Sequence, residues 1–146
     1  MAGARPVLLD DRLLIEELLV GLRRRGTAPL CTTTHWYYRA CRAAVAGAGG
    51  QLSGPFAQLG VDEQQRAVLG LLELRDDIGL PEPRACVPMM ADVARRRPRL
   101  NLLNVEAVAA ARLLGATVWL SPPAASGLLA TVLDAERIRW RAVSIG

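Results

Sequence analysis

The chain has 146 residues, of which 51% are hydrophobic and 22% are charged. This composition suits one globular domain with its own core, and it excludes a disordered or fibrous chain. The net charge of +4 comes from 18 basic residues, all of them arginine, so a phosphate-bearing partner is compatible with the charge but not required by it.

Cysteine content and hydropathy exclude several other classes of protein. The three cysteines and the single histidine, His35, fit no zinc-ligand spacing, and unpaired cysteines are typical of the reducing cytoplasm. No long apolar run precedes Asp10, so no signal peptide is expected. The longest uncharged stretch, residues 113–133, is interrupted by Pro122 and Pro123, which predicts a strand, a turn and a helix rather than a membrane span.

The first half of the chain alternates between short apolar runs and helical periodicity. In order, we expect a strand, a helix, a second strand and a second helix at residues 7–9, 12–25, 29–33 and about 34–46. Gly26 would end the first helix, and one of the threonines at 32–34 would cap the second. Residues 51–60 are expected to form a loop, with Phe56 against the core.

The second half continues this alternation. We expect a connection at 76–83, a turn at 121–126, strands at 116–120 and 138–145, and helices at 62–75, from 88 to about 97, at 103–114 and at 127–134. Asp62 and Gln65 have capping-box spacing, Pro88 suits a first helical turn, and Gly115 is typical of a helix end. The helix at 62–75 would bury three apolar side chains, Val68, Leu69 and Leu72.

Strands separated by helices predict a mostly parallel α/β sheet of four or five strands, covered by helices on both faces. The strand that ends at Asp10 is expected near the centre of this sheet. In such sheets, functional sites gather at the carboxyl ends of the strands. Asp10 and Asp11 are therefore the first candidates for site residues.

Two segments carry a resemblance to a known family. Residues 7–14 read VLLDDRLL, a strand that ends in aspartate and leads into a helix. Residues 102–121 read LLNVEAVAAARLLGATVWLS, an alanine-rich helix followed by a glycine-alanine pair and a strand. In order and length, along nearly the whole chain, this pattern resembles the PIN-domain family and its toxin-type ribonuclease fold. The resemblance implies a single PIN-like domain over residues 1–146.

The resemblance also implies a metal site. PIN nucleases carry three or four carboxylates that hold Mg²⁺ or Mn²⁺, and the metal activates water for phosphodiester hydrolysis. Asp10 matches the first acid and is the metal-binding candidate. The second acid would lie early in the second helix, yet no acidic residue occurs between Glu17 and Asp62, and the nearest occupants of that place are Tyr38 and Arg39.

The remaining two family acids are also replaced. Counted back from the end of the alanine-rich helix, the third falls on Asn104, which offers a carbonyl oxygen without charge, and the fourth falls on Ser121 or Pro122. Glu106 could complete an unusual ligand set with Asp10 and Asn104, although two residues along a helix turn its side chain to another face. The plainer roles are helix caps, Asp10 for the first helix and Asn104 for the alanine-rich one.

Six arginines are candidate contacts to nucleic acid, namely Arg39, Arg42, Arg95, Arg96, Arg97 and Arg99. The first two lie where the family keeps an acid, and if they face the cleft they would change it from cation-binding to anion-binding. The other four form the strongest basic run, whose plainer interpretation is a solvated helix end stabilised by the helix dipole. The aromatic residues at 36–38 could stack on bases, or divide between core packing and a subunit contact.

Three hypotheses of function follow. The first is a PIN-like domain that has lost most of its metal-binding acids and binds nucleic acid or a protein without catalysis. The second is a Mg²⁺- or Mn²⁺-dependent ribonuclease that uses Asp10, Asn104 and Glu106. The third is a homodimeric protein-interaction domain, which the mean hydropathy of +0.21 favours.

The three hypotheses differ in their partners and cofactors. A metal ion is expected only under the second, and no cofactor under the other two. The candidate partners are a second copy of the chain, RNA and an antitoxin-like protein, the last implied by the family resemblance. A cytoplasmic location without membrane contact is expected for all three.

Overall fold

The computed structural model describes residues 4–22, 26–46 and 60–144, and a five-stranded parallel sheet forms its centre. The strands are ordered β3-β2-β1-β4-β5, and each neighbouring pair is parallel. Their bounds are β1 Val7–Leu9, β2 Leu30–Thr32, β3 Ile78–Gly79, β4 Thr117–Leu120 and β5 Trp140–Ala142. The parallel sheet and the central place of the strand before Asp10 confirm the fold class predicted from the sequence.

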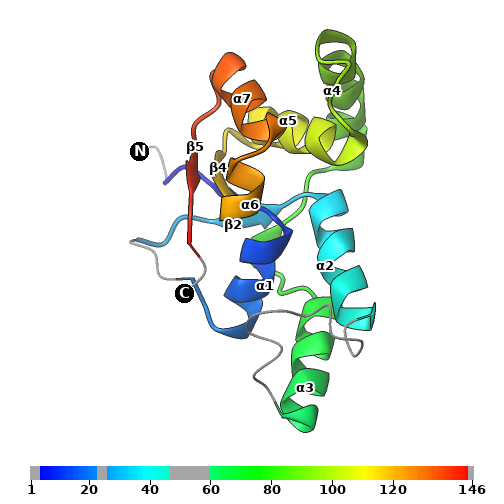
Figure 1. Ribbon diagram of the computed structural model, residues 1–146, viewed down its shortest axis with the longest axis vertical. Helices are drawn as coiled ribbons and strands as arrows, with labels where there is room; N and C mark the ends of the chain where they lie inside the picture. The colour runs from blue at the N-terminus through cyan, green and yellow to red at the C-terminus, as the bar shows by residue number, and fades with distance from the viewer. Residues whose placement is uncertain (1–3, 23–25, 47–59, 145–146) are drawn as a thin grey trace.

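Helices connect the strands and form a layer on each face of the sheet. Their bounds are α1 Asp11–Leu19, α2 Thr34–Ala46, α3 Val61–Leu72, α4 Pro83–Arg96, α5 Leu102–Leu114, α6 Pro122–Ala125 and α7 Leu128–Ala135. In the view of Figure 1, α1, α2 and α3 lie below the sheet, and α4, α5 and α7 lie above it.

Side chains along each strand alternate between these two helix layers. Leu8 packs, with its register neighbours Cys31 and Val118, into a core shared with α4, α5 and α7. Val7 and Leu9 point the other way, into a second core shared with α1, α2 and α3. Because both faces of the sheet are buried, the strands read as uninterrupted apolar runs rather than as alternating ones.

The first helix is shorter than its periodicity predicts. α1 ends at Leu19 rather than near residue 25, because Gly21 adopts a left-handed φ of 88° and the Glu17 carboxylate accepts the N–H of Leu22. Gly26 is therefore not its cap. Two predicted segments lie outside the described residues, namely 23–25 at the end of this helix and 51–59 of the loop with Phe56.

The starts of α2 and α3 differ in how well they were predicted. α2 begins where expected, and the hydroxyl of Thr33, one of the three candidate caps, accepts the N–H of Trp36 at 2.9 Å. α3 begins directly after Gly60, which provides no side-chain cap, so the predicted capping box of Asp62 and Gln65 is wrong.

The buried face of α3 also differs from the prediction. Leu71 is buried and Val68 partly so, whereas Leu69 and Leu72 are exposed. Apolar residues occur on more than one face of the segment 67–74, so periodicity alone does not decide which face is covered. Packing against α1 and α2 makes that choice.

The sequence gives little sign of β3 or of the start of α4. β3 pairs with β2 inside the segment expected to be a plain connection, and its two residues are too few to show a period. α4 begins at Pro83, where the missing N–H is harmless, and Glu82 caps it by accepting the N–H of Ala85. Pro88 therefore lies inside the helix and not in its first turn, which corrects the prediction.

The last part of the chain agrees most closely with expectation. α5 ends at Gly115, whose φ of 62° is left-handed, and β4 follows two residues later. The predicted turn at 121–126 contains the short helix α6, and the last strand, β5, is a sheet edge as predicted, although shorter. Within the described ranges, no helix is long and apolar enough to cross a membrane.

Candidate functional site

The carboxyl ends of β1, β2 and β4 lie at one edge of the sheet, and several candidate residues gather there. Asp10 follows β1, Thr33 follows β2 and Ser121 follows β4. Because these strands are parallel neighbours, their ends meet at the same edge. α5 brings a fourth polar side chain, Glu106, to the start of α2.

The Asp10 carboxylate is fully enclosed, with an exposed fraction of 0%. Its Oδ1 accepts the N–H of Leu13 at 2.9 Å, so Asp10 is the N-cap of α1, as its plainer interpretation predicts. Its Oδ2 accepts the N–H and the hydroxyl of Ser121, at 2.8 and 2.6 Å. Burial raises the pKa of Asp10 above its usual value despite these hydrogen bonds. Both oxygens of this carboxylate thus hold the fold together.

Glu106 is also buried, and it joins α5 to the start of α2. Its Oε2 accepts the N–H of Thr34 at 3.0 Å, and its Oε1 accepts the N–H of His35 at 2.8 Å. The ring atom Nδ1 of His35 lies 2.6 Å from the same Oε1. The first N–H groups of a helix have no partner inside the helix, and the helix dipole favours negative charge there. Glu106 therefore caps α2 from a distant part of the chain.

Asn104 does not cap α5. The cap is Asn101, whose Oδ1 accepts the N–H of Asn104 at 2.9 Å. The helix begins one residue earlier than predicted, which places Asn104 in its first turn, half-buried. No hydrogen bond joins Asn104 to Asp10 or to Glu106 among the side chains that the structure describes. The three residues of the nuclease hypothesis are thus not joined to one another by hydrogen bonds.

A basic residue pairs with the acid directly after Asp10. The Nε atom of Arg39, on α2, lies 3.3 Å from Oδ2 of Asp11, the residue directly after Asp10. Asp11 also accepts the N–H of Arg12 at 3.0 Å. Arg39 therefore reaches the carboxyl end of β1 and pairs with an acid there. Arg42 is exposed further along the same helix.

The residues at this edge do not fit the divalent metal of PIN nucleases. Mg²⁺ and Mn²⁺ need oxygen ligands that can turn free lone pairs toward the ion. Asp10 and Glu106 already accept hydrogen bonds on both oxygens, and Asp11 is paired with Arg39. In the part of the chain that the structure describes, no three side chains of His, Cys, Asp or Glu lie together so that they could hold an ion.

The aromatic residues that follow His35 have three different environments. Trp36 is buried in the core beside α5. The Tyr37 hydroxyl lies 3.0 Å from the carbonyl oxygen of Leu71 and 3.1 Å from that of Leu72, which ties α2 to the end of α3. Tyr38 is 61% exposed. Core packing therefore explains the first, a helix contact explains the second, and Tyr38 stays available on the surface of α2.

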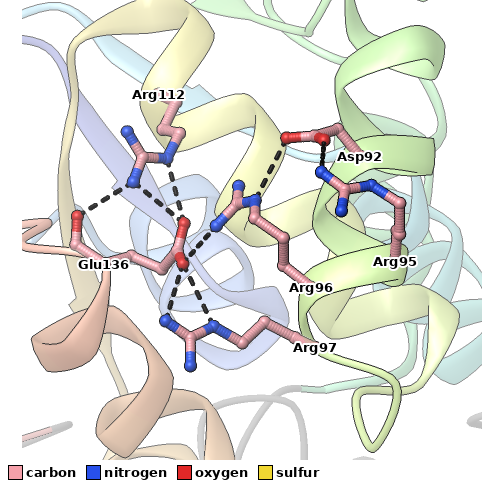
Figure 2. A network of polar contacts seen from close by, with 6 residues as sticks. All are labelled: Asp92, Arg95, Arg96, Arg97, Arg112 and Glu136. Carbon is pink, nitrogen blue, oxygen red and sulfur yellow. Dashed lines mark hydrogen bonds and ion pairs between the residues drawn. The ribbon is translucent and has the colours of Figure 1, made fainter.

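A second concentration of charge lies where α4, α5 and α7 end (Figure 2). Glu136 follows α7, and three arginines converge on its carboxylate: Arg96 and Arg97 from the end of α4, and Arg112 from α5. We call these four residues the Glu136 cluster. The Glu136 side chain is only 2% exposed. The hydrogen bond from Arg96 is the largest cause that lowers the pKa of Glu136 to about 2, and those from Arg97 and Arg112 act in the same direction.

The cluster changes the interpretation of the basic run at 95–99. Arg95 fits the solvated helix end, since it pairs only with the exposed Asp92 at 2.8 Å. Arg96 pairs with both Asp92 and Glu136, and Arg97 turns fully onto Glu136. Arg99 is exposed. Two of the four predicted arginines therefore hold a buried carboxylate in addition to any external role.

Two members of the cluster, Arg112 and Glu136, were not among the predicted residues. They are 24 positions apart, and only the packing of the two helix ends brings them together. The sequence offers one faint signal, an acidic residue directly after the apolar helix at 127–134. Exposed acids are common at such places, so the signal is not specific.

Comparison with known proteins adds one finding about the fold. No family model matches the chain, and no curated protein matches it. The chain is similar to a chain in the 2.2 Å structure of VapBC-1 from nontypeable Haemophilus influenzae, with a TM-score of 0.50 and 15% sequence identity. The match covers 94% of this chain and 97% of that one. Together with the parallel sheet, it confirms that the fold is PIN-like.

Proposed function

We propose that the chain is a single PIN-like domain over residues 1–146 that has lost metal-dependent nuclease chemistry and works by binding nucleic acid. One observation carries this proposal. Both oxygens of Asp10, the family acid that the sequence retains, accept hydrogen bonds from Leu13 and Ser121 in a fully buried position. These three donors leave the carboxylate about one of its four lone-pair sites, and at 0% exposure that site does not face the solvent from which an ion would bind.

The charge around Asp10 also opposes a metal ion. By the family resemblance, Arg39 is one of the two residues nearest to the place of the second acid, and it is paired with Asp11. Two like unit charges about 4 Å apart repel by roughly 1–4 kcal/mol at effective dielectric constants of 80 to 20. Because about 1.4 kcal/mol is a factor of ten in affinity, a repulsion of that size corresponds to about fivefold to eight-hundredfold weaker binding of a unit charge, and the pairing of Arg39 with Asp11 reduces it.

The distribution of charge supports an anionic partner. Residues 82–146 contain nine arginines and five acidic residues, whereas residues 1–81 contain nine of each. The whole excess of +4 therefore lies in the segment that starts at α4. The proposed contacts to nucleic acid are Arg39, Arg42, Arg95, Arg96, Arg97 and Arg99. Binding of this kind weakens as salt rises, because the nucleic acid releases condensed counterions when arginines replace them.

The test combines cleavage with metal binding. The chain is incubated with mixed-sequence single-stranded RNA and Mg²⁺ or Mn²⁺, beside an active PIN nuclease as positive control. We expect no metal-dependent cleavage and salt-dependent RNA binding. We also expect no rise in the thermal unfolding midpoint on addition of Mn²⁺, since an ion that bound the folded state would raise it.

The opposite result would establish the ribonuclease hypothesis. That result is cleavage by the unmodified chain that requires the metal and disappears in Asp10→Asn or Glu106→Gln. Circular dichroism must show that these variants remain folded, because both side chains cap helices. If the chain neither cleaves nor binds RNA at low salt, the protein-interaction hypothesis takes the place of our proposal.

A homodimer is a second proposal, and it rests on a different observation. Among the described residues, large apolar side chains are exposed on five helices, including Val45, Leu69, Val87, Leu102 and Leu128. Such surface is costly in water unless a partner covers it. Light scattering is expected to give twice the chain mass of 15.7 kDa, and the mass of one chain at tens of micromolar would remove this proposal.

Two further proposals come from the sequence. An antitoxin-like protein partner rests on the family resemblance, and a cytoplasmic location rests on the unpaired cysteines. Co-expression with a candidate antitoxin-like protein, followed by co-purification and cross-linking, tests the first. Fractionation of the source cells tests the second.

A further inference from the structure

The carboxylate of the Glu136 cluster is saturated by its three arginines. Oε1 accepts hydrogen bonds from the Nε and Nη2 groups of Arg112, at 3.1 and 2.9 Å. Oε2 accepts Nη1 of Arg96, together with Nε and Nη2 of Arg97 at 3.1 and 2.8 Å. A carboxylate has about four lone-pair sites, so five donors leave it no capacity for another. The arginines have more donors than their acceptor can use.

Unused donors of the cluster remain close to solvent. Among the described residues, Nη2 of Arg96, Nη1 of Arg97 and Nη1 of Arg112 have no hydrogen-bond acceptor. The side chains of these three arginines are 31%, 34% and 41% exposed. Figure 2 shows guanidinium nitrogens that are not joined to the carboxylate by any dashed line. The arginines are thus fixed on one side by Glu136 and open on the other.

The local charge is positive after all internal pairs are formed. Arg95, Arg96, Arg97 and Arg112 contribute four positive charges, against which stand only Asp92 and Glu136 (Figure 2). Glu136 stays ionised at neutral pH, because the guanidinium groups hold its pKa at about 2. Two positive charges therefore remain uncompensated within this network.

A fifth arginine stands next to the cluster in an unfavourable backbone conformation. Arg137 follows Glu136 directly, is exposed, and has a left-handed φ of 59°. Its N–H donates to the carbonyl of Asp134, and the N–H of Ile138 donates to that of Leu133. α5 ends with the same pair of hydrogen bonds, and there the left-handed position is filled by glycine, Gly115. At the end of α7 the left-handed position is therefore occupied by Arg137, whereas at the equivalent end of α5 it is occupied by glycine, which this conformation favours.

We propose that Arg96, Arg97, Arg112 and Arg137 form a binding site for the phosphate groups of a single-stranded nucleic acid, and that Glu136 holds the first three in place. This inference rests on the proposed function and adds Arg112 and Arg137 to its contacts. We call these four arginines the phosphate face. When no ligand is bound, the negative charge of Glu136 offsets the repulsion between the three guanidinium groups.

Chemistry favours a phosphate diester over other anions. Guanidinium forks bind phosphate oxygens through paired N–H groups, and several forks around one point suit a group with oxygens in several directions. A chain of phosphates also engages the exposed Arg95 and Arg99 beside the phosphate face, which a single free phosphate cannot do. A nucleic-acid backbone and a free phosphate present the same phosphate oxygens, and the experiment distinguishes between these two ligands.

The test measures binding of a fluorescently labelled single-stranded RNA by anisotropy over a range of salt concentrations. The variants are Arg112→Gln, Arg137→Gly and the matched control Arg66→Gln, an exposed arginine on α3 that loses the same charge. We expect each of the first two to weaken binding by about two- to tenfold, because water and salt screen an exposed guanidinium–phosphate pair to about the strength of one ordinary hydrogen bond. The slope of log affinity against log salt should become shallower by about 0.7 for each lost phosphate contact.

Arg137→Gly keeps the inference testable if Arg112→Gln fails to fold. This change leaves the Glu136 cluster intact and replaces a left-handed arginine by the residue that this conformation favours, so the variant is expected to fold at least as well as the original chain. Weaker RNA binding by a more stable variant cannot be explained by unfolding. If both variants bind RNA as the Arg66→Gln control does, the phosphate face is wrong, although the proposed nucleic-acid function stands.

Two further results separate this inference from the proposed function. If the chain binds no RNA but inorganic pyrophosphate shifts the arginine side-chain NMR signals, and Arg112→Gln removes the shift, the site takes free phosphates and our assignment to nucleic acid is overturned. If neither RNA nor pyrophosphate binds, both the site and the proposed binding function fail. Metal-dependent cleavage would overturn the loss of nuclease chemistry without any bearing on this face.

Discussion

Two buried carboxylates, Asp10 at the carboxyl edge of the sheet and Glu136 beside α4, α5 and α7, are held in opposite ways. Asp10 accepts hydrogen bonds from neutral backbone and hydroxyl groups, and burial raises its pKa. Glu136 accepts hydrogen bonds from three guanidinium groups, which hold its pKa at about 2. Neutral donors satisfy a carboxylate without adding charge, whereas three arginines leave positive charge that a second anion can use.

The two carboxylates therefore have different roles: one stabilises the fold, and the other positions arginines. At the sheet edge, Asp10 joins the start of α1 to the end of β4. In the Glu136 cluster, a buried acid holds three arginines whose side chains are partly exposed to solvent. Unfolding measurements on variants of each site test whether the two carboxylates differ as strongly in energy as they do in geometry.

The largest effect is expected for Glu136→Gln. A shift of the Glu136 pKa from 4.5 to about 2 corresponds to about 3 kcal/mol, because each unit is worth about 1.4 kcal/mol. Removal of the charge also leaves three part-buried arginines facing one another. We expect urea unfolding at pH 7 to show a loss of about 3–5 kcal/mol. The exposed Glu73→Gln should change the unfolding free energy by less than about 0.5 kcal/mol, and an equal loss in both variants would contradict the role of the cluster.

The pH dependence of stability is expected to have opposite signs at the two carboxylates. The folded-state pKa of Glu136 is lowered, so its stabilisation is present above about 4.5 and is lost as pH falls toward about 2. The folded-state pKa of Asp10 is raised, so its contribution is most favourable below 3.8 and declines as pH rises through the raised value. Unfolding free energies measured from pH 7 down to pH 2 should therefore fall less steeply for Glu136→Gln than for the original chain. Parallel curves would refute the assignment.

A smaller loss is expected for Ser121→Ala. The Ser121 hydroxyl donates to buried Oδ2 of Asp10 at 2.6 Å, and a hydrogen bond to a charged group contributes about 1.5–3 kcal/mol. We expect the unfolding free energy to drop by that amount and the pKa of Asp10 to rise further, which NMR titration of the side chain would show. The control Ser126→Ala removes an exposed hydroxyl bonded to the Pro123 carbonyl and should have an effect below about 0.5 kcal/mol.

The layered fold was predictable because its signals are local. Val7–Leu9 and Thr117–Leu120 are apolar runs bounded by turn residues, and Gly115 marks a helix end, so each can be recognised without knowledge of the rest of the chain. β3 has only two residues, and α1 is ended by Gly21 together with a Glu17 hydrogen bond, which no period reveals.

The sites were less predictable than the fold, because their partners are distant in sequence. Asp10 and Ser121 are 111 positions apart, and Glu106 lies 72 positions from Thr34. The sequence identified Asp10 and Glu106 as acids of interest, but it could not show that their oxygens are occupied by backbone groups. Backbone N–H groups occur at almost every position, so a sequence carries no sign of which of them will meet a given carboxylate.

The smallest effect, and the one that best distinguishes structural from functional constraint, is expected for Arg137→Gly. The left-handed conformation costs an L-residue about 1–2 kcal/mol, and glycine avoids most of this cost while losing about 0.5–1 kcal/mol of chain entropy on folding. We therefore expect the variant to be more stable by up to about 1 kcal/mol. The reciprocal change at the equivalent position of α5, Gly115→Ala, should destabilise the chain by about 1 kcal/mol, because a Cβ there meets no atom within 4 Å and only the φ of 62° opposes it. Urea unfolding of both variants measures the two shifts. If both variants change the unfolding free energy in the same direction, the ends of α5 and α7 are not equivalent. Opposite signs, together with weaker RNA binding by Arg137→Gly, would show that the arginine remains at a position where it costs stability because it contributes to binding.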